Sequence, residues 1–271
     1  MKRICVLIIS LLLLPGAYAF TIITWNIQDL GRTKTSEEID AMVQILRIAD
    51  LVLIQEVVAK DPAGAQKVAA LADGLNRTGA RWDYRMSDPT NSPSPYISER
   101  YAILWKPSVL EIQGRARLLS ELAEECDREP FAAEFSLRGE SESFWIVNFH
   151  ARRHDNFPDE EIKHFITLGQ ILDSQNVIIG GDFNLDDAHD VWAPFYQIGY
   201  RSVVSDLPTT LKRSCNRQGE YFNYPIDNVY LPEGWVVQDS GRIDTAGDCD
   251  RVEEARGLSD HLPVFAEILS E

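Results

Sequence analysis

The sequence predicts an α/β fold in which two packed β-sheets are covered by helices on their outer faces. Two observations lead to this expectation. Short segments rich in Ile, Val, Phe, Trp and Tyr recur along the chain at strand length, and amphipathic segments with helical spacing separate several of them. The 271 residues are 45% hydrophobic, without an internal repeat or a long linker. We therefore expect one large domain of layered sheets and helices.

Eight segments are expected to be strands, because each is short and rich in β-branched and aromatic residues. They are Thr21–Trp25, Leu51–Ile54, Tyr101–Trp105, Phe131–Leu137, Phe144–Phe149, Val177–Gly180, Asn228–Leu231 and Pro263–Ile268. Three helices are expected at Ser36–Ile48, after Asp61-Pro62, and at Pro158–Asp173. Thr35 and Glu38 have the spacing of a capping box, and the proline of Asp61-Pro62 suits a first helical turn.

The first 19 residues are expected to be a signal peptide. Lys2 and Arg3 precede an apolar run, Ile4–Leu14, and Ala17-Tyr18-Ala19 has the small residues of a cleavage site. The run of about eleven residues is too short for a helix across a bilayer about 30 Å thick. A membrane anchor or a buried helix is the alternative interpretation. The mature protein would be a single domain, residues 20–271, secreted or periplasmic and without stable membrane association.

Three cysteines would remain in the mature chain, namely Cys126, Cys215 and Cys249. In an oxidising compartment one pair can form a disulfide. We expect the pair Cys215–Cys249, because these two flank one strand-like stretch. No cysteine lies beside a histidine with the spacing of a zinc site.

The chain is strongly acidic. Its formal charge is −16, and loss of Lys2 and Arg3 with the signal would take it from −16 to −18. Proteins that hold nucleic acid tightly and without specificity use Lys and Arg to neutralise phosphates, so this charge argues against that class. It suits an enzyme that draws cations to a carboxylate site, and it is equally consistent with a well solvated surface.

Polar residues of the kinds that perform catalysis lie at the ends of six predicted strands. They are Asn26, Gln55-Glu56, His150, Asp182 with Asn184, Asp227, and Ser259-Asp260-His261. Any one of them could be an ordinary turn residue, because Asp and Asn favour turns. Two of the five histidines and four acids at corresponding positions indicate one shared site instead.

These residue types favour phosphodiester hydrolysis. Carboxylate and amide oxygens suit a hard cation such as Mg²⁺. Cleavage of a phosphodiester needs positive charge near the non-bridging oxygens, an aligned water and proton transfer, for which histidines and acids serve. The sequence has no Gly-x-Ser-x-Gly elbow and no Walker loop, which argues against acyl transfer and nucleoside triphosphate hydrolysis.

Six short motifs follow one another along nearly the whole mature chain. They are Trp25-Asn26-Ile27, Ile54-Gln55-Glu56, Val147-Asn148-Phe149-His150, Gly180-Gly181-Asp182-Phe183-Asn184, Ile226-Asp227-Asn228 and Ser259-Asp260-His261-Leu262-Pro263-Val264. In this order they resemble the DNase I-like endonuclease/exonuclease/phosphatase superfamily. Ser98-Glu99-Arg100-Tyr101 and Arg128-Glu129-Pro130 further resemble its DNase I branch. The resemblance implies a four-layer αββα sandwich with two mixed sheets between layers of helices.

The resemblance also implies a divalent-metal site. Asn26, Glu56 and Asp260 would lie at the metal, with Glu56 as the most direct ligand, and the ion would be Mg²⁺ or Mn²⁺. A structural Ca²⁺ is a further expectation, since Asp206 with Thr209 and Thr210 faintly resembles a calcium loop.

The same resemblance implies catalytic and substrate-binding residues. His150 paired with Glu99, and His261 paired with Asp227, would be general acid/base groups or phosphate contacts, and the sequence leaves open which does which. The residues that would orient water and the scissile phosphate are Asp182 and Asn184, and the residue that would contact a backbone phosphate is Arg128. A surface role remains the alternative for Glu99 and Arg128, and a turn role for Asp227.

The residues that hold DNA resemble the DNase I branch less closely than the catalytic ones do. Gln28 and Val58 stand where that branch has arginines for the minor groove. Arg152-Arg153, after His150, could supply a substitute phosphate contact or form an exposed loop pair.

The resemblance implies a secreted, monomeric, metal-dependent endonuclease that cleaves DNA to 5′-phosphate and 3′-hydroxyl ends, with RNA left open as a second substrate. One rival is a phospholipid diesterase or phosphatase of the same superfamily; the other is a non-catalytic interaction subunit on this scaffold. Trp192, Phe195 and Tyr196 have the spacing of a helix that packs inward rather than of a membrane-docking hairpin. The intact acids and histidines disfavour a non-catalytic scaffold.

Overall fold

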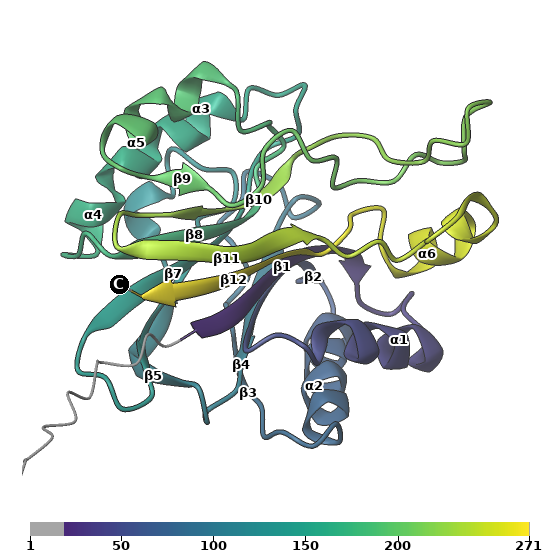
Figure 1. Cartoon of the computed structure of the whole chain (residues 1–271), viewed down its shortest axis with the longest axis horizontal. Helices are drawn as coiled ribbons and strands as arrows, with labels where there is room; N and C mark the ends of the chain where they lie inside the picture. Colours follow the sequence, from purple (N-terminus) through teal and green to yellow (C-terminus); the bar gives the residue numbers. More distant parts are fainter. Residues whose placement is uncertain (1–18, 271) are drawn as a thin grey trace, which may run out of the picture.

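Two six-stranded β-sheets packed face to face form the centre of the molecule (Figure 1). The structure is a computed structural model and describes residues 19–270. In spatial order, the first sheet contains β11 (Trp235–Arg242), β12 (Val264–Ser270), β1 (Ala19–Leu30), β2 (Leu51–Val58), β4 (Glu99–Trp105) and β3 (Asp83–Met86). The second contains β5 (Leu110–Leu118), β6 (Phe131–Leu137), β7 (Ser143–His150), β8 (Val177–Asp182), β10 (Asp227–Leu231) and β9 (Arg201–Ser202).

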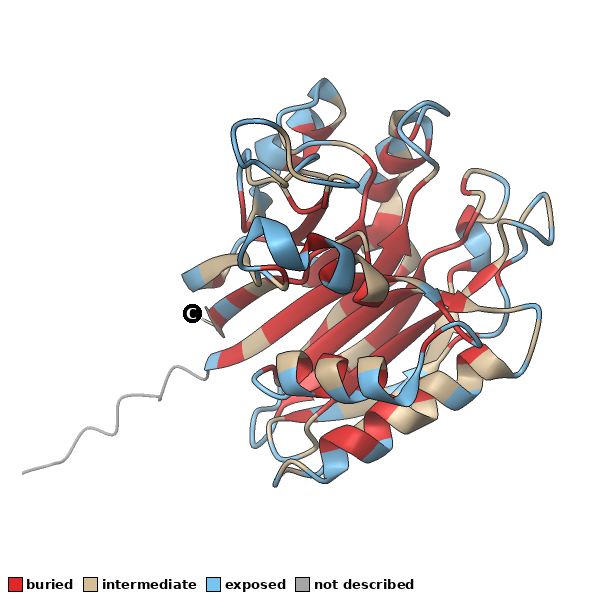
Figure 2. Ribbon diagram, turned by 90° about the vertical axis from the view of Figure 1, so that its right-hand side faces the viewer, coloured by how far each residue is buried: buried red, intermediate tan, exposed pale blue. Residues whose placement is uncertain are grey.

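Helices cover the outer face of each sheet. Over the first sheet lie α1 (Ser36–Leu46) and α2 (Ala63–Asn76), and over the second lie α3 (Asp159–Ile162), α4 (Leu168–Ile171) and α5 (Ala193–Gln197). A further helix, α6 (Val252–Leu258), precedes β12. Short 3₁₀ turns are η1 (Ser120–Leu122), η2 (Lys163–Thr167), η3 (Asp190–Trp192) and η4 (Cys249–Arg251). Figure 2 shows buried strands in the middle and exposed helix faces outside. The α/β class and the four-layer sandwich are therefore confirmed.

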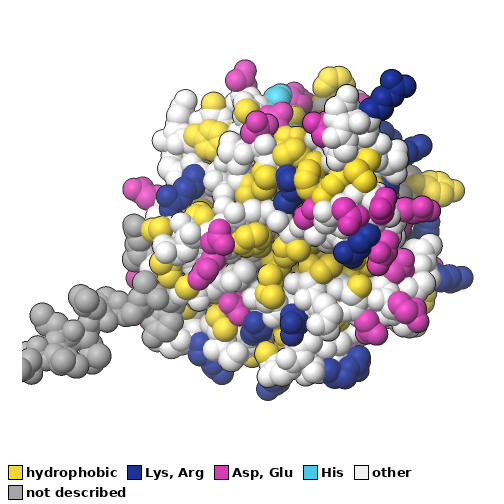
Figure 3. Space-filling model, turned by 45° about the vertical axis from the view of Figure 1, so that its right-hand side comes forward, with side chains coloured by type: hydrophobic (Ala, Val, Ile, Leu, Met, Phe, Trp, Pro, Cys, Tyr) yellow, Lys and Arg dark blue, Asp and Glu magenta, His cyan; other side chains and the backbone are white. Residues whose placement is uncertain are grey.

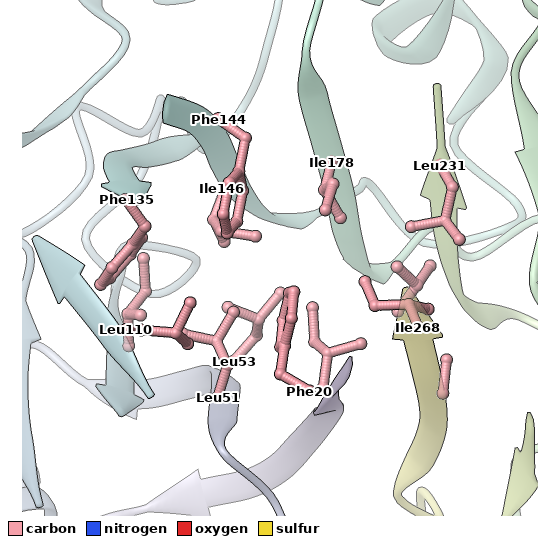
Figure 4. Packing of buried hydrophobic residues seen from close by; sticks show 14 of the residues in the cluster. Phe20, Leu51, Leu53, Leu110, Phe135, Phe144, Ile146, Ile178, Leu231 and Ile268 are labelled. Carbon is pink, nitrogen blue, oxygen red and sulfur yellow. The ribbon is translucent and has the colours of Figure 1, made fainter. Parts of the chain in front are cut away.

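An apolar core fixes the two sheets against each other. Phe20, Leu53 and Ile268 of the first sheet face Phe144 and Ile178 of the second (Figure 4), and each is at most 2% exposed. Burial of such side chains contributes about 1.5–3 kcal/mol each. Because the sheets are held this closely, the strand ends of both keep fixed positions at the edge of the sandwich.

The strand register gathers the polar residues at one edge. β1 pairs in parallel with β2, which places Asn26 beside Gln55. In the second sheet β7 pairs in parallel with β8, which places His150 beside Asp182, and antiparallel β10 puts Asp227 opposite Asp182. Carboxyl ends of parallel strands lie at the same edge, so these side chains meet there.

Some element bounds differ from the sequence expectation. Four strands, β3, β5, β9 and β11, lack the apolar pattern of the others. All four are edge strands of their sheets, where one side of the ladder faces no partner and most side chains stay partly exposed. β1 and β8 continue beyond their apolar segments into the polar residues.

The single helix expected at Pro158–Asp173 is wrong. The structure has α3, the 3₁₀ turn η2 and α4 in its place. The buried residues Ile162, Phe165 and Leu168 recur every three positions, a spacing that both a 3₁₀ helix and one face of an α-helix allow. The capping box of Thr35 and Glu38 at the start of α1 is confirmed.

Residues 1–18 of the expected signal peptide lie outside the described residues. Within residues 19–270, no helix is both long and apolar enough to cross a membrane. The disulfide joins Cys215 to Cys249, the expected pair, and Cys126 is a buried free thiol.

Candidate active site

A cavity of about 500 Å³ opens where the strand ends meet. Eight of the ten residues that the sequence predicts for the site line it, namely Glu56, Glu99, Arg128, His150, Asp182, Asn184, Asp260 and His261. The other two are buried beneath the lining. Asn26 is 0% exposed and contacts Glu56, and Asp227 is 2% exposed and contacts His261. The fold therefore brings all ten together, from both sheets and from the loops before β6, after β8 and before β12.

Asp182, at the end of β8, is the centre of the arrangement. Its Oδ2 accepts a hydrogen bond of 3.0 Å from Asn26 Nδ2 and lies 3.4 Å from His150 Nε2 and 3.7 Å from His261 Nε2. Burial raises the pKa of Asp182, and the nearby His261 opposes that shift. Gly181 precedes it with φ +155°, and a side chain there would clash with the backbone carbonyl of the neighbouring strand β7.

His150 forms the first of two imidazole–carboxylate pairs. Its Nδ1 lies 2.9 Å from the buried Glu99 carboxylate, and its backbone N–H donates to the Tyr101 hydroxyl. Burial and the Arg128 guanidinium lower the pKa of His150 to about 4, so the imidazole is neutral at neutral pH. Burial raises the pKa of Glu99 to about 7, against the effect of Arg128. Only Nε2 of His150 faces the cavity centre at Asp182.

His261 forms the second pair. Its Nδ1 lies 2.9 Å from Asp227 Oδ2, and the same oxygen accepts a hydrogen bond of 2.6 Å from Thr209 Oγ1. Burial lowers the pKa of His261, but Asp227 and Asp182 outweigh burial and raise it to about 10. The two histidines thus have opposite charge states at neutral pH, as acid and base partners require.

Asn26 and Glu56 fit a hard divalent cation. Asn26 Nδ2 donates to Glu56 Oε1 at 3.0 Å, while the buried Asn26 Oδ1 has no hydrogen-bond partner among the described residues. A buried carbonyl oxygen without a partner is costly unless an ion or water satisfies it. Asp29 N–H holds the other Glu56 oxygen at 3.1 Å. An amide oxygen beside a carboxylate is a donor set suited to Mg²⁺ or Mn²⁺.

A second group of potential ligands is Asp182, Asp227 and His261, whose atoms lie within 4.8 Å of one another. Because His261 Nδ1 is hydrogen-bonded to Asp227, this group works better as a proton-transfer array than as a cation site. Asp260 lines the cavity, with one oxygen 3.6 Å from Arg256 Nη2.

Both threonine hydroxyls of the expected calcium loop make other hydrogen bonds. Asp206 N–H donates to Asp187, and the Thr209 hydroxyl serves Asp227. The Thr210 hydroxyl bonds the backbone of Tyr224. Within residues 19–270, no group of three or more acids, histidines or cysteines at metal-ligand distance includes Asp206.

The arginines near the site are partly engaged. Arg128 is 7% exposed; its Nε donates to the His150 carbonyl at 3.0 Å and its Nη2 to the Ala151 carbonyl. It therefore supports His150 from behind and has only its remaining N–H groups for a phosphate. Arg152 is bound to the carboxylates of Asp127 and Glu161, which leaves Arg153 as the member of that pair that lines the cavity.

Several residues that hold the site in place stand inside the predicted motifs, but the sequence alone assigns them no role. Ser259 Oγ donates to the Asn26 carbonyl and accepts from the backbone N–H of Gln28 and His261. Between the sheets, Gln55 Nε2 donates to Asn148 Oδ1 at 2.7 Å. The place of Ser259, Gln55 and Asn148 inside the motifs is the available sequence signal, but their supporting roles depend on contacts between distant segments.

Comparison with known proteins gives consistent matches. Residues 23–261 match the model of the Endonuclease/Exonuclease/phosphatase family. The chain is 29% identical to a deoxyribonuclease of Thioalkalivibrio sp. (strain K90mix), covering 98% of this chain and 76% of that protein. It is 30% identical to human deoxyribonuclease-1-like 1, covering 96% and 88%. A solved Bacteroides thetaiotaomicron protein of the same family description superposes with a TM-score of 0.65 at 13% identity, covering 94% and 99%.

Proposed function

The chain belongs to the endonuclease/exonuclease/phosphatase family, and on this premise we propose that it is a secreted or periplasmic, metal-dependent endonuclease that hydrolyses DNA to 5′-phosphate and 3′-hydroxyl ends. One observation carries the proposal: two imidazole–carboxylate pairs face Asp182 from either side, directly beside Asn26 and Glu56. Relatives named as deoxyribonucleases support DNA as the substrate. The Cys215–Cys249 disulfide supports an oxidising compartment.

The two histidines would carry the proton transfers. His150 Nε2 accepts a proton from the water that attacks phosphorus, because burial and Arg128 lower its pKa and keep this imidazole neutral. His261 Nε2 donates a proton to the departing 3′ oxygen as the P–O bond breaks, because Asp227 holds its Nδ1 and stabilises the charged ring. Asp182, within 4 Å of both Nε2 atoms, orients the water.

Asn26 and Glu56 would hold the metal, with Asp260 as a third candidate. When bound, Mg²⁺ or Mn²⁺ supplies positive charge to the non-bridging phosphate oxygens. Titration calorimetry with Mn²⁺ tests the site without reference to activity. We expect Glu56→Gln to abolish binding that Glu160→Gln, an exposed acid on α3, leaves intact. Equal Mn²⁺ affinity of both variants would contradict the assignment.

Plasmid nicking by the purified mature protein tests the activity. Nicking with Mg²⁺ should stop with EDTA. His150→Ala should lower its rate at least about 10²-fold, the scale for loss of a proton-transfer group. His164→Ala, in η2 and outside the cavity, is the matched control. A parallel sphingomyelin assay covers the rival function, and lipid cleavage without nicking would overturn the proposal.

A further inference from the structure

A buried polar link joins the two sheets beside the candidate site. Asn148 of β7 and Gln55 of β2 are both 0% exposed, and Gln55 Nε2 donates to Asn148 Oδ1 at 2.7 Å. Gln55 precedes Glu56 in the chain, and Asn148 lies two residues before His150. On the basis of the proposed function, we infer that these two side chains are positioning residues that set the metal candidates Asn26 and Glu56 against the imidazole of His150.

The alternation of β7 places this amide between the sheets. Alternate residues of a strand point to the same face. Phe144 and Ile146 of β7 face the first sheet within the apolar core (Figure 4), so Asn148 and His150 continue that face toward the cavity. Asn148 therefore stands where the strand otherwise carries apolar side chains, and a buried amide is stable there only because its polar atoms have partners.

The Asn148 amide contacts both sides of an irregularity in the first sheet. Its Nδ2 donates to the carbonyls of Ile54 in β2 and Ala102 in β4, at 3.0 and 3.1 Å. These two residues form the last regular pair before the register shifts, and the next pair is Val57 with Arg100. Between the two pairs β2 advances three positions while β4 advances two, so β2 carries one extra residue, a β-bulge.

The bulge sets the direction of Glu56. This residue lies inside it with φ +59°, and its N–H donates to the Glu99 carboxylate at 3.3 Å. A backbone in this conformation persists only where surrounding contacts hold it. The two bonds from Asn148 hold β2 and β4 where the irregularity begins, so they fix the direction in which the Glu56 carboxylate leaves the strand.

Gln55 extends the link to the second metal candidate. Its Nε2 donates to the Thr24 hydroxyl of β1 at 3.0 Å as well as to Asn148. Thr24 and Asn26 lie two positions apart on β1 and so share a face, and Asn26 Nδ2 donates to Glu56 at 3.0 Å. One chain of hydrogen bonds therefore runs from β7 through β2 to β1, the three strands that carry the imidazole and both metal candidates.

The placement of these ligands matters because Mg²⁺ binds within narrow geometric limits. It requires a near-octahedral set of ligands at about 2.0–2.1 Å. Surface charge is a poor substitute: on the face drawn in Figure 3, acidic side chains are interspersed with Lys and Arg, and salt screens exposed charges over about 10 Å. In metal sites, replacing a residue that holds a ligand without touching the ion typically lowers affinity or activity about 10- to 100-fold.

Titration calorimetry with Mn²⁺ measures the placement without reference to activity. Asn148→Ala removes all three hydrogen bonds of the amide, so we expect its Mn²⁺ affinity to fall about 10- to 100-fold. Gln55→Met, the second variant, breaks the link to Thr24 but leaves both carbonyl bonds of Asn148 in place, and we expect a loss of about tenfold. Asn76→Ala is the matched control. The Asn76 amide, at the end of α2 and outside the cavity, also donates to two carbonyls and accepts from one N–H.

Plasmid nicking supplies a second readout. A positioning role predicts that kcat of Asn148→Ala falls about 10- to 100-fold. KM for DNA should stay near that of the wild type, because neither side chain of the link is exposed to substrate. A purely structural role predicts a lower Tm with wild-type Mn²⁺ affinity and wild-type kcat at temperatures where the variant is folded. Asn76→Ala should behave in this second way.

The outcomes separate this inference from the proposed function. If the wild-type protein bound no Mn²⁺, the metal site of the proposed function would itself be wrong. If the wild type bound Mn²⁺ and both variants bound it equally well, the positioning role would be refuted and the proposed function would stand. An equal loss of affinity in Asn76→Ala would also refute the role, because the effect would then be general. If Asn148→Ala did not fold, the Mn²⁺ affinity of Gln55→Met would decide in the same way.

Discussion

The hydrogen bonds of Ser259 allow a specific prediction for Ser259→Ala. The serine is 0% exposed and joins two parts of the site. Its Oγ donates to the Asn26 carbonyl at 2.6 Å and accepts from the N–H groups of Gln28 and His261 at 3.1 Å each. The alanine variant keeps the space nearly filled but removes all three hydrogen bonds. The backbone of Asn26, a candidate metal ligand, is then no longer joined through this side chain to the backbone of His261.

The size of the effect follows from burial. A buried backbone group left without a partner costs about 1–3 kcal/mol. Gln28 is only half-buried and can turn to water, so the Asn26 carbonyl and the His261 N–H dominate the loss. We expect the free energy of unfolding to fall by about 2–4 kcal/mol, with a Tm lower by roughly 5–15 °C for a domain of this length. Misplacement of a reacting group by about 1 Å can cost 10²-fold in rate, so kcat for nicking should fall about 10- to 100-fold at temperatures where the variant is folded.

Calorimetry and plasmid nicking measure the two effects, with Ser120→Ala as the control. Ser120 is an exposed serine of η1, so its truncation should leave both Tm and kcat near those of the wild type. If Ser259→Ala lowered the free energy of unfolding by less than about 1 kcal/mol and kept its kcat, the Ser259 hydrogen bonds would contribute neither to stability nor to catalysis. Ser259 would then not be the residue that aligns β1 with the segment before β12.

Three further predictions concern groups around the site. Asp227→Asn should lower kcat for nicking at least about 10²-fold, because His261 loses the carboxylate that accepts its Nδ1 proton; an unchanged kcat would contradict the pairing. Lys34→Met should lower the free energy of unfolding by about 1–3 kcal/mol in a urea titration, because the buried ammonium donates to two carbonyls at the end of α6, at 3.0 and 2.8 Å. Cys215→Ser should lower the free energy of unfolding by up to about 4 kcal/mol, since the disulfide with Cys249 spans 34 residues. Reduction of the wild-type protein should cause the same loss. A urea unfolding midpoint that changes with neither treatment would argue against the disulfide.

The sequence predicts those parts of the fold whose physics is local. Buried strands have continuous apolar segments, which solvent-exposed elements lack. Every central strand can therefore be predicted from the sequence, including β1, β2, β7 and β8. The edge strands β3, β5, β9 and β11 are not, because one side of each ladder is open and the side chains need not be apolar. The 3₁₀ turn η2, which interrupts the expected helix, is not predicted for a different reason. Its buried residues fit a helix of either period, and packing of Phe165 against Phe149 of the sheet, with centroids 4.6 Å apart, is a tertiary contact.

The candidate site divides along the same line. Residues such as Asp182 and His261 are predictable because they carry the chemistry and stand at strand ends. Their supports are not, since Ser259 bonds Asn26 across 233 positions and Gln55 bonds Asn148 across 93. Nor does the sequence reveal that two of the N–H donors of Arg128 are used by backbone carbonyls. Such roles depend on which segments the fold brings into contact.

Three residues that line the cavity have a strained backbone with positive φ. Of the six non-glycine residues with positive φ in residues 19–270, three line the cavity: Asp29 at +50°, Glu56 at +59° and Asn184 at +51°. Such a conformation costs on the order of 1–3 kcal/mol and persists only where other contacts hold it.

In each case the strained residue turns its own backbone N–H to a carboxylate of the site. Asp29 donates to Glu56 at 3.1 Å, Glu56 donates to Glu99 at 3.3 Å, and Asn184 donates to Asp182 at 2.9 Å. At Glu56 the strand register shifts between Ile54 and Val57, which frees that N–H from the ladder. A regular strand would pair these N–H groups with a neighbouring strand and leave three buried or half-buried carboxylates with fewer donors. The strain is therefore the means by which this fold keeps several negative charges close together at one edge, ready for a cation and a phosphate.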